Sequence, residues 1–63
     1  MCESNVYLYS EDKGEELLLE RVDKIIPSGD ELFLENIFGE RKIVKARIKE
    51  MALVEHKIVL EKL

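Results

Sequence analysis

The chain has 63 residues, enough for one small domain, with 10 basic and 14 acidic residues and a net charge of −4. This charge argues against a general nucleic-acid-binding protein, because such proteins carry a basic excess. No apolar run approaches the roughly 20 residues of a membrane span, and the polar, acidic start is unlike a secretory signal. A lone cysteine without an export signal is typical of the reducing cytoplasm. We therefore expect a single soluble cytoplasmic domain over residues 1–63.

The small size of the chain limits the core that it can build. A domain of about 60 residues buries only about 60% of the surface of its unfolded chain. Small folds usually add a disulfide framework, a bound metal or a partner chain. With one cysteine and one histidine, the chain can form neither an internal disulfide nor a closed structural zinc site by itself. The remaining ways to stabilise the fold are good packing, oligomerisation or a metal ion shared between chains.

The first half of the sequence reads as short strands separated by turns. Residues 5–10 alternate, with Val6 and Leu8 on one side and two tyrosines on the other. A hairpin loop follows, in which Gly14 is available for a positive φ. Residues 16–21 contain three consecutive leucines, which predict a strand buried on both faces or one at a subunit interface.

Turn signals also divide the next part of the chain. Residues 22–26 form a short extended stretch, because the residue before Pro27 is disfavoured in the helical region. The Pro-Ser-Gly-Asp sequence at 27–30 is a clear turn. Residues 31–36 alternate again, and Gly39 marks the next break.

Residues 41–55 fit two structures. From Val44 to Lys49 apolar and basic residues alternate strictly, which predicts a strand. Val44, Ile48 and Met51 also fit helical spacing, so an amphipathic helix is the alternative. The two-residue period and the β-branched residues favour the strand. The sequence therefore predicts an all-β fold, a small, mostly antiparallel SH3- or Sm-like β-barrel of five to seven short strands.

The patterns of most enzymes are missing from the sequence. Its three glycines are isolated turn residues and form no phosphate-binding loop. Its single cysteine and single histidine are 54 positions apart, and no serine motif is placed for nucleophilic attack. We therefore expect a protein that is not an enzyme.

Cys2 is the residue best suited to metal chemistry. If Met1 is removed, the free amine and the Cys2 thiolate form a five-membered chelate; if Met1 stays, its amine and the Cys2 nitrogen and sulfur form two fused rings. Such planar nitrogen and sulfur donors suit Ni(II) or Cu(II), and thiolate also binds Zn(II). Two chains related by a two-fold axis would complete a square N2S2 site. The alternative is a small, weakly polar residue at the start of a strand.

His56 is the only imidazole in the chain. Residues 54–61 read as the last strand, with Val54, His56, Ile58 and Leu60 on one face. We therefore expect a packed, hydrogen-bonded histidine in the core or at an interface. A metal-binding or proton-coupled role is the alternative.

A basic strip is the basis of a different functional hypothesis. On a strand, Lys45, Arg47 and Lys49 share one face, and the two tyrosines of residues 5–10 would supply stacking rings nearby. This composition is typical of small barrels that bind RNA. Acidic residues flank the strip and the net charge is negative, so a solvated edge strand is the simpler interpretation. We do not expect RNA to be the main partner.

Four segments of the sequence resemble the CooT family, very small cytoplasmic nickel-binding accessory proteins associated with carbon monoxide dehydrogenase maturation. The similarity covers nearly the whole chain, and its Met-Cys-Glu-Ser start is the most specific part. The matching segments are residues 1–8, residues 17–20 with Val22 and Asp23, residues 38–42, and residues 56–60. The resemblance implies one CooT-like domain, a homodimeric β-barrel that binds Ni(II) through Cys2.

We therefore expect a homodimer that binds Ni(II) at a site shared between the Cys2 residues of two chains. It would carry or buffer nickel for a metalloenzyme such as carbon monoxide dehydrogenase, with the enzyme or a maturation protein as its client, and would also accept Zn(II) or Cu(II) in vitro. The alternative is a small RNA-binding or protein-interaction module that uses Lys45, Arg47 and Lys49.

Overall fold

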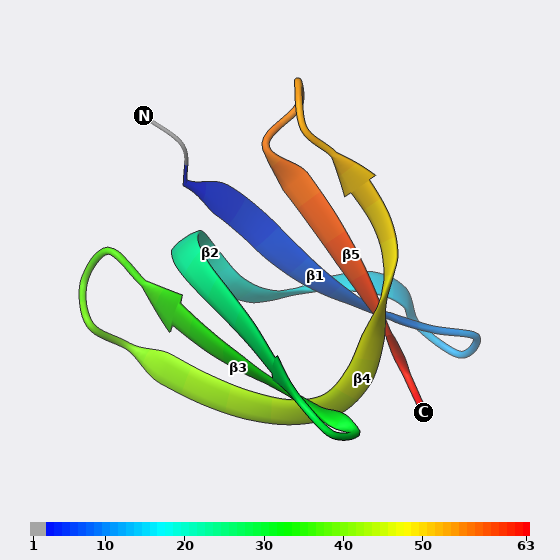
Figure 1. Cartoon of the computed structure of the whole chain (residues 1–63). Coiled ribbons are helices and arrows are strands. Elements are labelled where there is room, and N and C mark those ends of the chain that lie inside the picture. The colour runs from blue at the N-terminus through cyan, green and yellow to red at the C-terminus, as the bar shows by residue number, and fades with distance from the viewer. Residues whose placement is uncertain (1–2) are drawn as a thin grey trace.

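Five β-strands form the computed structural model, which describes residues 3–63. The strands close into a barrel in the order β1–β2–β3–β4–β5 (Figure 1). The described part of the chain contains no helix, and therefore none that could cross a membrane. The expected all-β fold is confirmed. The bounds are β1 Ser4–Ser10, β2 Gly14–Ser28, β3 Glu31–Asn36, β4 Arg41–Ala52 and β5 Lys57–Lys62.

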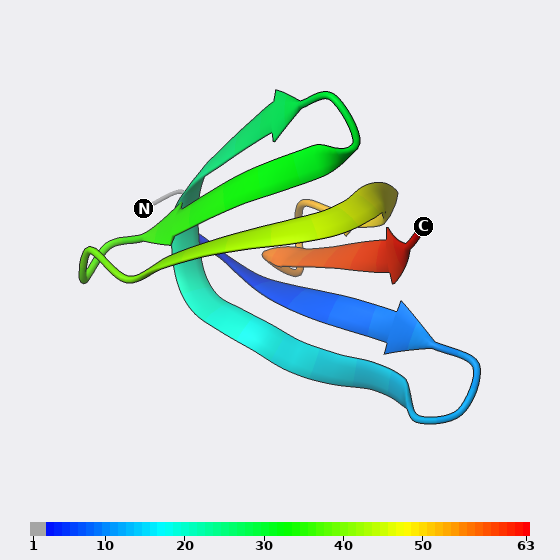
Figure 2. The ribbon, with the colours of Figure 1, turned by 90° about the horizontal axis from the view of Figure 1, so that it is seen from below.

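The barrel is closed by its one parallel strand pair. Consecutive strands pair antiparallel, whereas β1 and β5 run parallel with Asn5 opposite Lys57. Figure 2 shows β1 between β2 and β5. A parallel pair brings the starts of both strands to the same edge, so the beginning of the described chain lies beside the beginning of its last strand.

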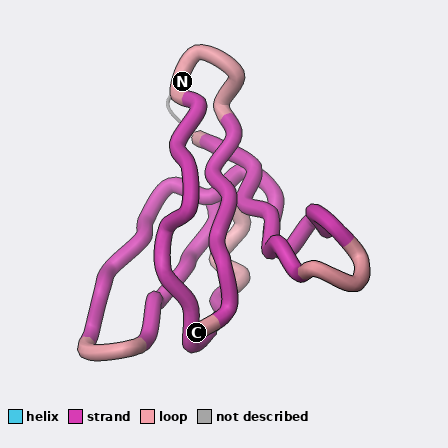
Figure 3. Tube along the Cα trace, turned by 90° about the vertical axis from the view of Figure 1, so that its right-hand side faces the viewer, coloured by secondary structure: helices cyan, strands magenta, loops and turns pink. Residues whose placement is uncertain are grey.

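The hairpin turns therefore gather at two ends of the barrel. The β1–β2 and β2–β3 turns lie at one end, which we call the far end (Figure 1). The start of β1 and the β3–β4 and β4–β5 turns lie at the other, which we call the β1 end. Figure 3 shows the same turns as loops that project from the strands.

The core lies inside the barrel and follows the predicted alternation. Val6, Leu34 and Leu60 are fully buried, and Leu8 packs against the same cluster. The predicted inward faces of residues 5–10 and 31–36 are thus confirmed. The remaining members of the buried cluster are Leu19, Val22, Leu32, Ala46 and Ile58.

The three leucines at 17–19 do not lie in a strand buried on both faces. The pairing with β1 shifts by one residue at this point, which makes Leu18 the extra residue of a β-bulge. Leu18 and Leu19 both pack toward the core, whereas Leu17 is 54% exposed. The expected two-sided burial is therefore wrong within one chain, and a place at a subunit interface stays a prediction.

Two strands are much longer than expected. Residues 16–21 and 22–26 form one continuous strand, β2, of 15 residues, and β4 has 12 residues. β2 bends at Arg21, whose φ of 53° is left-handed. This bend lets the first half of β2 pair with β1 and the second half with β3. The strand interpretation of residues 41–55 is confirmed up to Ala52, where β4 ends.

A buried asparagine fixes the turn between β3 and β4. Asn36 is 3% exposed, and its Oδ1 accepts hydrogen bonds from the backbone N–H groups of Phe38 (3.0 Å) and Glu40 (2.8 Å). Its Nδ2 donates to Glu40 Oε1 at 2.7 Å. Both polar atoms of this buried side chain, Oδ1 and Nδ2, therefore have hydrogen-bond partners within the turn. The turn holds the Phe38 side chain out in solvent, where it is 61% exposed.

The last strand begins later than predicted. Val54 and His56 lie in the turn between β4 and β5, and β5 starts at Lys57. Val54 is 94% exposed, and His56 is exposed as well. The expectation that His56 packs with Ile58 and Leu60 in the core is therefore wrong, because the residue belongs to the turn that precedes the strand. A place for His56 at an interface stays a prediction.

Candidate functional site

The predicted metal ligand Cys2 lies outside the described residues. Glu3, the residue that follows it, is half-buried at the start of β1. The chemistry that can be described is therefore that of the β1 end, around the point where the described chain begins.

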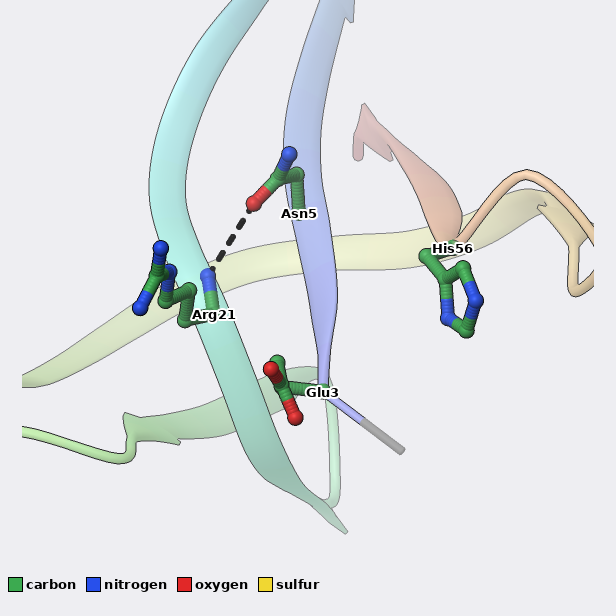
Figure 4. A pocket seen from close by; sticks show the side chains of 4 residues that line it. All are labelled: Glu3, Asn5, Arg21 and His56. Carbon is green, nitrogen blue, oxygen red and sulfur yellow. Dashed lines mark hydrogen bonds between the residues drawn. The ribbon is translucent and has the colours of Figure 1, made fainter. Parts of the chain in front are cut away.

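A pocket of about 230 Å³ opens beside the start of β1. Asn5 lines it from β1, Glu3 from the residue just before β1, Arg21 from the bend of β2, and His56 from the turn before β5 (Figure 4). Two separate features of the fold bring these residues together. The bulged bend of β2 supplies Arg21, and the parallel pairing of β1 with β5 supplies His56.

A path of hydrogen bonds ties this end of the barrel together. The Ile37 N–H donates to the Arg21 carbonyl oxygen (3.0 Å), and the Arg21 N–H donates to Asn5 Oδ1 (3.1 Å). The Asn5 N–H in turn donates to the His56 carbonyl oxygen (2.9 Å). The β3–β4 turn, the bend of β2, the start of β1 and the β4–β5 turn are thus held in one arrangement.

The pocket also concentrates backbone strain. Within residues 3–63, the only non-glycine residues with positive φ are Arg21 (53°) and His56 (54°), and both line the pocket. A side chain in this region costs about 1–2 kcal/mol. Such strain persists where the surrounding structure imposes it, and it clusters at functional sites.

The charged and polar groups of the side chains that line the pocket point in different directions. The Arg21 guanidinium is over the Phe38 ring, 5.9 Å from its centroid, and Figure 4 shows it turned away from Glu3. The Glu3 carboxylate lies on the β2 side of β1 and the His56 imidazole on the β5 side. The pocket therefore offers an oxygen donor and a nitrogen donor, with the cation of Arg21 directed elsewhere.

Comparison with known proteins assigns the chain to a family. A family model described as CO dehydrogenase accessory protein CooT matches residues 1–61. The chain belongs to the CooT family. The crystal structure of a protein described as a CooT from Carboxydothermus hydrogenoformans is 55% identical, covers 98% of both chains and has a TM-score of 0.90. A comparison with curated protein sequences gives no match.

CooT membership gives the pocket a chemical context. The family description names an accessory protein of carbon monoxide dehydrogenase, which is a metalloenzyme. Residues 3–63 of this CooT contain no group of three or more histidine, cysteine, aspartate and glutamate side chains that could hold a metal ion. A metal site at the β1 end would therefore need donors beyond those that these residues supply.

The basic strip is exposed on β4, and one of its three members forms an ion pair. Arg47 contacts Glu61 of β5 at 3.1 Å, and Lys45 lies opposite Glu31 of β3. Lys49 falls at a bulge of β4, and its Nζ is 5.1 Å from the centroid of the Tyr9 ring. The structure thus places the three basic residues on β4 as predicted, with Arg47 in an ion pair and Lys49 over an aromatic ring.

Sequence reasoning missed an apolar surface on the β4–β5 hairpin of this CooT. Ile48 and Met51 lie opposite the core residues Leu60 and Ile58 in the strand register, so they share the core-facing side of the sheet. They are nevertheless 41% and 55% exposed. Leu53 and Val54 continue this surface into the turn with 66% and 94% exposure. We call Ile48, Met51, Leu53 and Val54 the hairpin strip.

Asn5 and Arg21 were also missed as pocket residues. A signal for Arg21 exists in the sequence, because Leu19 and Val22 are both apolar but three positions apart. In a regular strand they would face opposite sides, so their burial on one side requires a bulge between them.

Proposed function

We propose that this CooT is a cytoplasmic, homodimeric nickel-binding accessory protein of carbon monoxide dehydrogenase. Cys2 of each chain contributes to one shared Ni(II) site, and the protein carries or buffers the ion for the enzyme. The observation that carries this proposal is the family match. It extends over residues 1–61, includes Cys2, and belongs to accessory proteins of a metalloenzyme.

The chemistry of the donors supports nickel at Cys2. Cys2 is the only thiol in the chain. A thiolate with an adjacent amine or backbone nitrogen provides a planar chelate, and planar fields of nitrogen and sulfur suit Ni(II). One such chelate fills half of a square. A second chain related by a two-fold axis would supply the other half through its own Cys2, which gives a square N2S2 site.

The exposed apolar side chains of the hairpin strip support the proposal that a second chain binds here. It includes three side chains that are more than half exposed, Met51, Leu53 and Val54. A surface of this kind is stabilised when another chain covers it, at about 25 cal/mol per Å² of apolar area. The strip reaches the turn that carries His56, at the same end of the barrel as the start of β1. A partner seated there would bring two chain starts close to each other.

Nickel titrations of the wild type and of variants in which the thiol is removed or moved test this function. Wild type should bind one Ni(II) per two chains and develop a thiolate-to-nickel charge-transfer band. Cys2→Ser exchanges the soft thiolate for a hard hydroxyl and should lose the band and most of the affinity. Cys2→Ser/Ser28→Cys keeps one thiol but moves it to the far end, and should not recover the band. Tight binding with the band in either variant would show that Cys2 is not the ligand.

The dimer is tested separately by light scattering without metal. We expect the mass of two chains at micromolar concentration, and a lower mass for Leu53→Glu/Val54→Glu, which places charges on the hairpin strip. A wild-type monomer would contradict the shared site.

A further inference from the structure

A second apolar surface lies on the outside of the barrel, across β3. Ile26 of β2 pairs opposite Phe33 of β3, and Phe33 pairs opposite Ile43 of β4. The residues on either side of Phe33, Leu32 and Leu34, are buried in the core, so alternation directs this row of three outward. Figure 2 shows β3 between the second half of β2 and β4. We call Ile26, Phe33 and Ile43 the β3 row.

Charged side chains flank the β3 row on both sides. On one side, the half-buried Glu35 carboxylate lies between two exposed cations, 3.8 Å from Lys24 Nζ and 3.4 Å from Arg41 Nε. On the other side, exposed Lys45 of β4 lies opposite half-buried Glu31 of β3. The exposed charges beside the β3 row are therefore cations, and the carboxylates lie lower, between the strands. We call the β3 row with Lys24, Arg41 and Lys45 the β3 face.

The charges of this face indicate what kind of surface fits it. An exposed apolar centre with a polar rim is typical of protein interaction sites. Three cations and two carboxylates make this region positive on a chain whose net charge is −4. A partner surface with carboxylates around an apolar centre complements it. A two-fold contact with a second copy would instead set the same cations against each other, because such an interface pairs each surface with itself.

The β3 face stays open when a second chain covers the hairpin strip. Ile48 of the strip lies on the core-facing side of β4, whereas Ile43 lies on its outer side. The centre of the face also differs from a nucleic-acid platform, where bases stack on exposed aromatic rings. Here the exposed members are the aliphatic Ile26 and Ile43, and the Phe33 ring is half-buried between them. The face therefore favours a protein as its occupant.

We propose that the β3 face is the docking surface for the client of this CooT, a protein that presents an apolar patch bordered by acidic residues. The inference rests on the accessory role proposed above, since an accessory protein must contact the enzyme that it serves. The family description names that enzyme as carbon monoxide dehydrogenase. Docking through this face uses no metal ligand, so it is separable from nickel binding.

Binding of carbon monoxide dehydrogenase to this CooT, measured by biolayer interferometry without added nickel, tests the face. The enzyme should come from the same organism. Ile26→Ser removes part of the apolar centre and should raise the Kd by about tenfold or more, as central interface residues do. Leu17→Ser is the matched control, because Leu17 lies on the same strand with 54% exposure against 50% for Ile26, but opposite Tyr7 of β1. It should bind as wild type does.

Two further variants separate docking from damage to the fold and from net charge. Ile43→Ser changes the other exposed member of the β3 row and should weaken binding as Ile26→Ser does, while both unfold in urea close to Leu17→Ser. Lys24→Glu should slow association and reduce its dependence on salt. Lys13→Glu alters the net charge equally but lies in the β1–β2 turn, so it should slow association less.

The outcomes distinguish docking from nickel binding. Wild-type affinity in both Ile26→Ser and Ile43→Ser would overturn the β3 face, and a nickel band that needs Cys2 would leave the proposed function standing. Weakened docking in these variants, together with a wild type that binds no nickel, would support the face and contradict the Cys2 site. A wild type that does not bind the enzyme at micromolar concentration would overturn the face.

Two other occupants would also overturn the proposal. A lower mass of Ile26→Ser in light scattering, with the mass of two chains kept by Leu53→Glu/Val54→Glu, would make the β3 face the contact between two copies. Submicromolar binding of a uridine 12-mer that Lys45→Glu abolishes, with unchanged binding of the enzyme, would make it a nucleic-acid surface.

Discussion

Within residues 3–63, the left-handed backbone positions at the far end of the barrel belong to glycine, whereas at the β1 end two of the three belong to residues with side chains. Gly14 and Gly29 occupy these positions next to the β1–β2 and β2–β3 turns. At the β1 end, Gly39 is joined by Arg21 and His56. Glycine adopts a positive φ without steric cost, while other residues lose about 1–2 kcal/mol.

The contrast shows where the fold tolerates strain to present a side chain. The far-end turns are exposed, and Gly14 and Gly29 reverse the chain there without a side chain. Arg21 and His56 instead line the pocket beside β1. The far end is therefore built for closure of the hairpins, and the β1 end for the presentation of chemical groups.

The largest loss of stability should come from a substitution in the barrel interior, which lies between the two ends. Leu34 is fully buried, so Leu34→Ala should lower the free energy of unfolding by about 2–5 kcal/mol through lost burial and a cavity. Ile43 lies on the neighbouring strand and is 65% exposed, so Ile43→Ala should cost much less. Urea unfolding measures both. Equal losses would mean that the barrel interior is not the stabilising core.

Substitutions at the two ends should act with opposite sign. Gly29→Ala forces a side chain into a φ of 61° and should destabilise the fold by about 1 kcal/mol. His56→Gly relieves a φ of 54° and should be stabilising by a similar or smaller amount. Thermal unfolding of the metal-free protein tests the pair. A clear loss of stability in His56→Gly would show that the imidazole supports the turn, and the contrast between the ends would fail.

The smallest effect concerns an ion pair that connects the ends. Lys57, at the start of β5, places its Nζ 2.7 Å from Glu15 Oε1, near the start of β2. The hydrogen bond to Glu15 raises the pKa of Lys57 above its ordinary value of 10.5. A raised folded-state pKa stabilises the fold below pH 10.5, and this contribution is lost as the pH rises through the folded-state value.

Melting curves of Lys57→Met against wild type test the sign of that linkage. The variant should melt slightly lower near neutral pH, and the difference should shrink as the pH rises above the ordinary lysine pKa of 10.5. The effect should be small because both side chains are partly exposed and water screens the pair. A difference that grows at alkaline pH would contradict the assignment.

Local pattern was sufficient to predict the inward faces of the barrel and two of its turns. Val6, Leu32 and Leu34 were placed inside because alternation in a strand assigns side chains to faces. Gly14 and the turn at Gly29 were recognised because positive φ favours glycine. The family resemblance, carried by the start of the chain and three further segments, is confirmed.

The pocket could not be predicted in the same way, because it depends on pairings between distant segments. His56 was assigned to a strand since Val54, His56, Ile58 and Leu60 alternate, and no glycine, proline or asparagine marks the turn at 53–56. Its place beside β1 follows from the parallel pairing of β1 and β5, which leaves no trace in local periodicity. The placement of Arg21 depends on a bulge that only the spacing of Leu19 and Val22 suggests.

Mapping nickel binding by NMR tests most directly whether the β1 end is the metal-binding end. Square-planar Ni(II) is diamagnetic, so amide signals of the loaded wild-type protein should remain visible and report changes by shift. We predict the largest shifts at Glu3, Asn5 and His56, with Gly14 and Gly29 unchanged. The largest shifts at the far-end glycines would contradict the account.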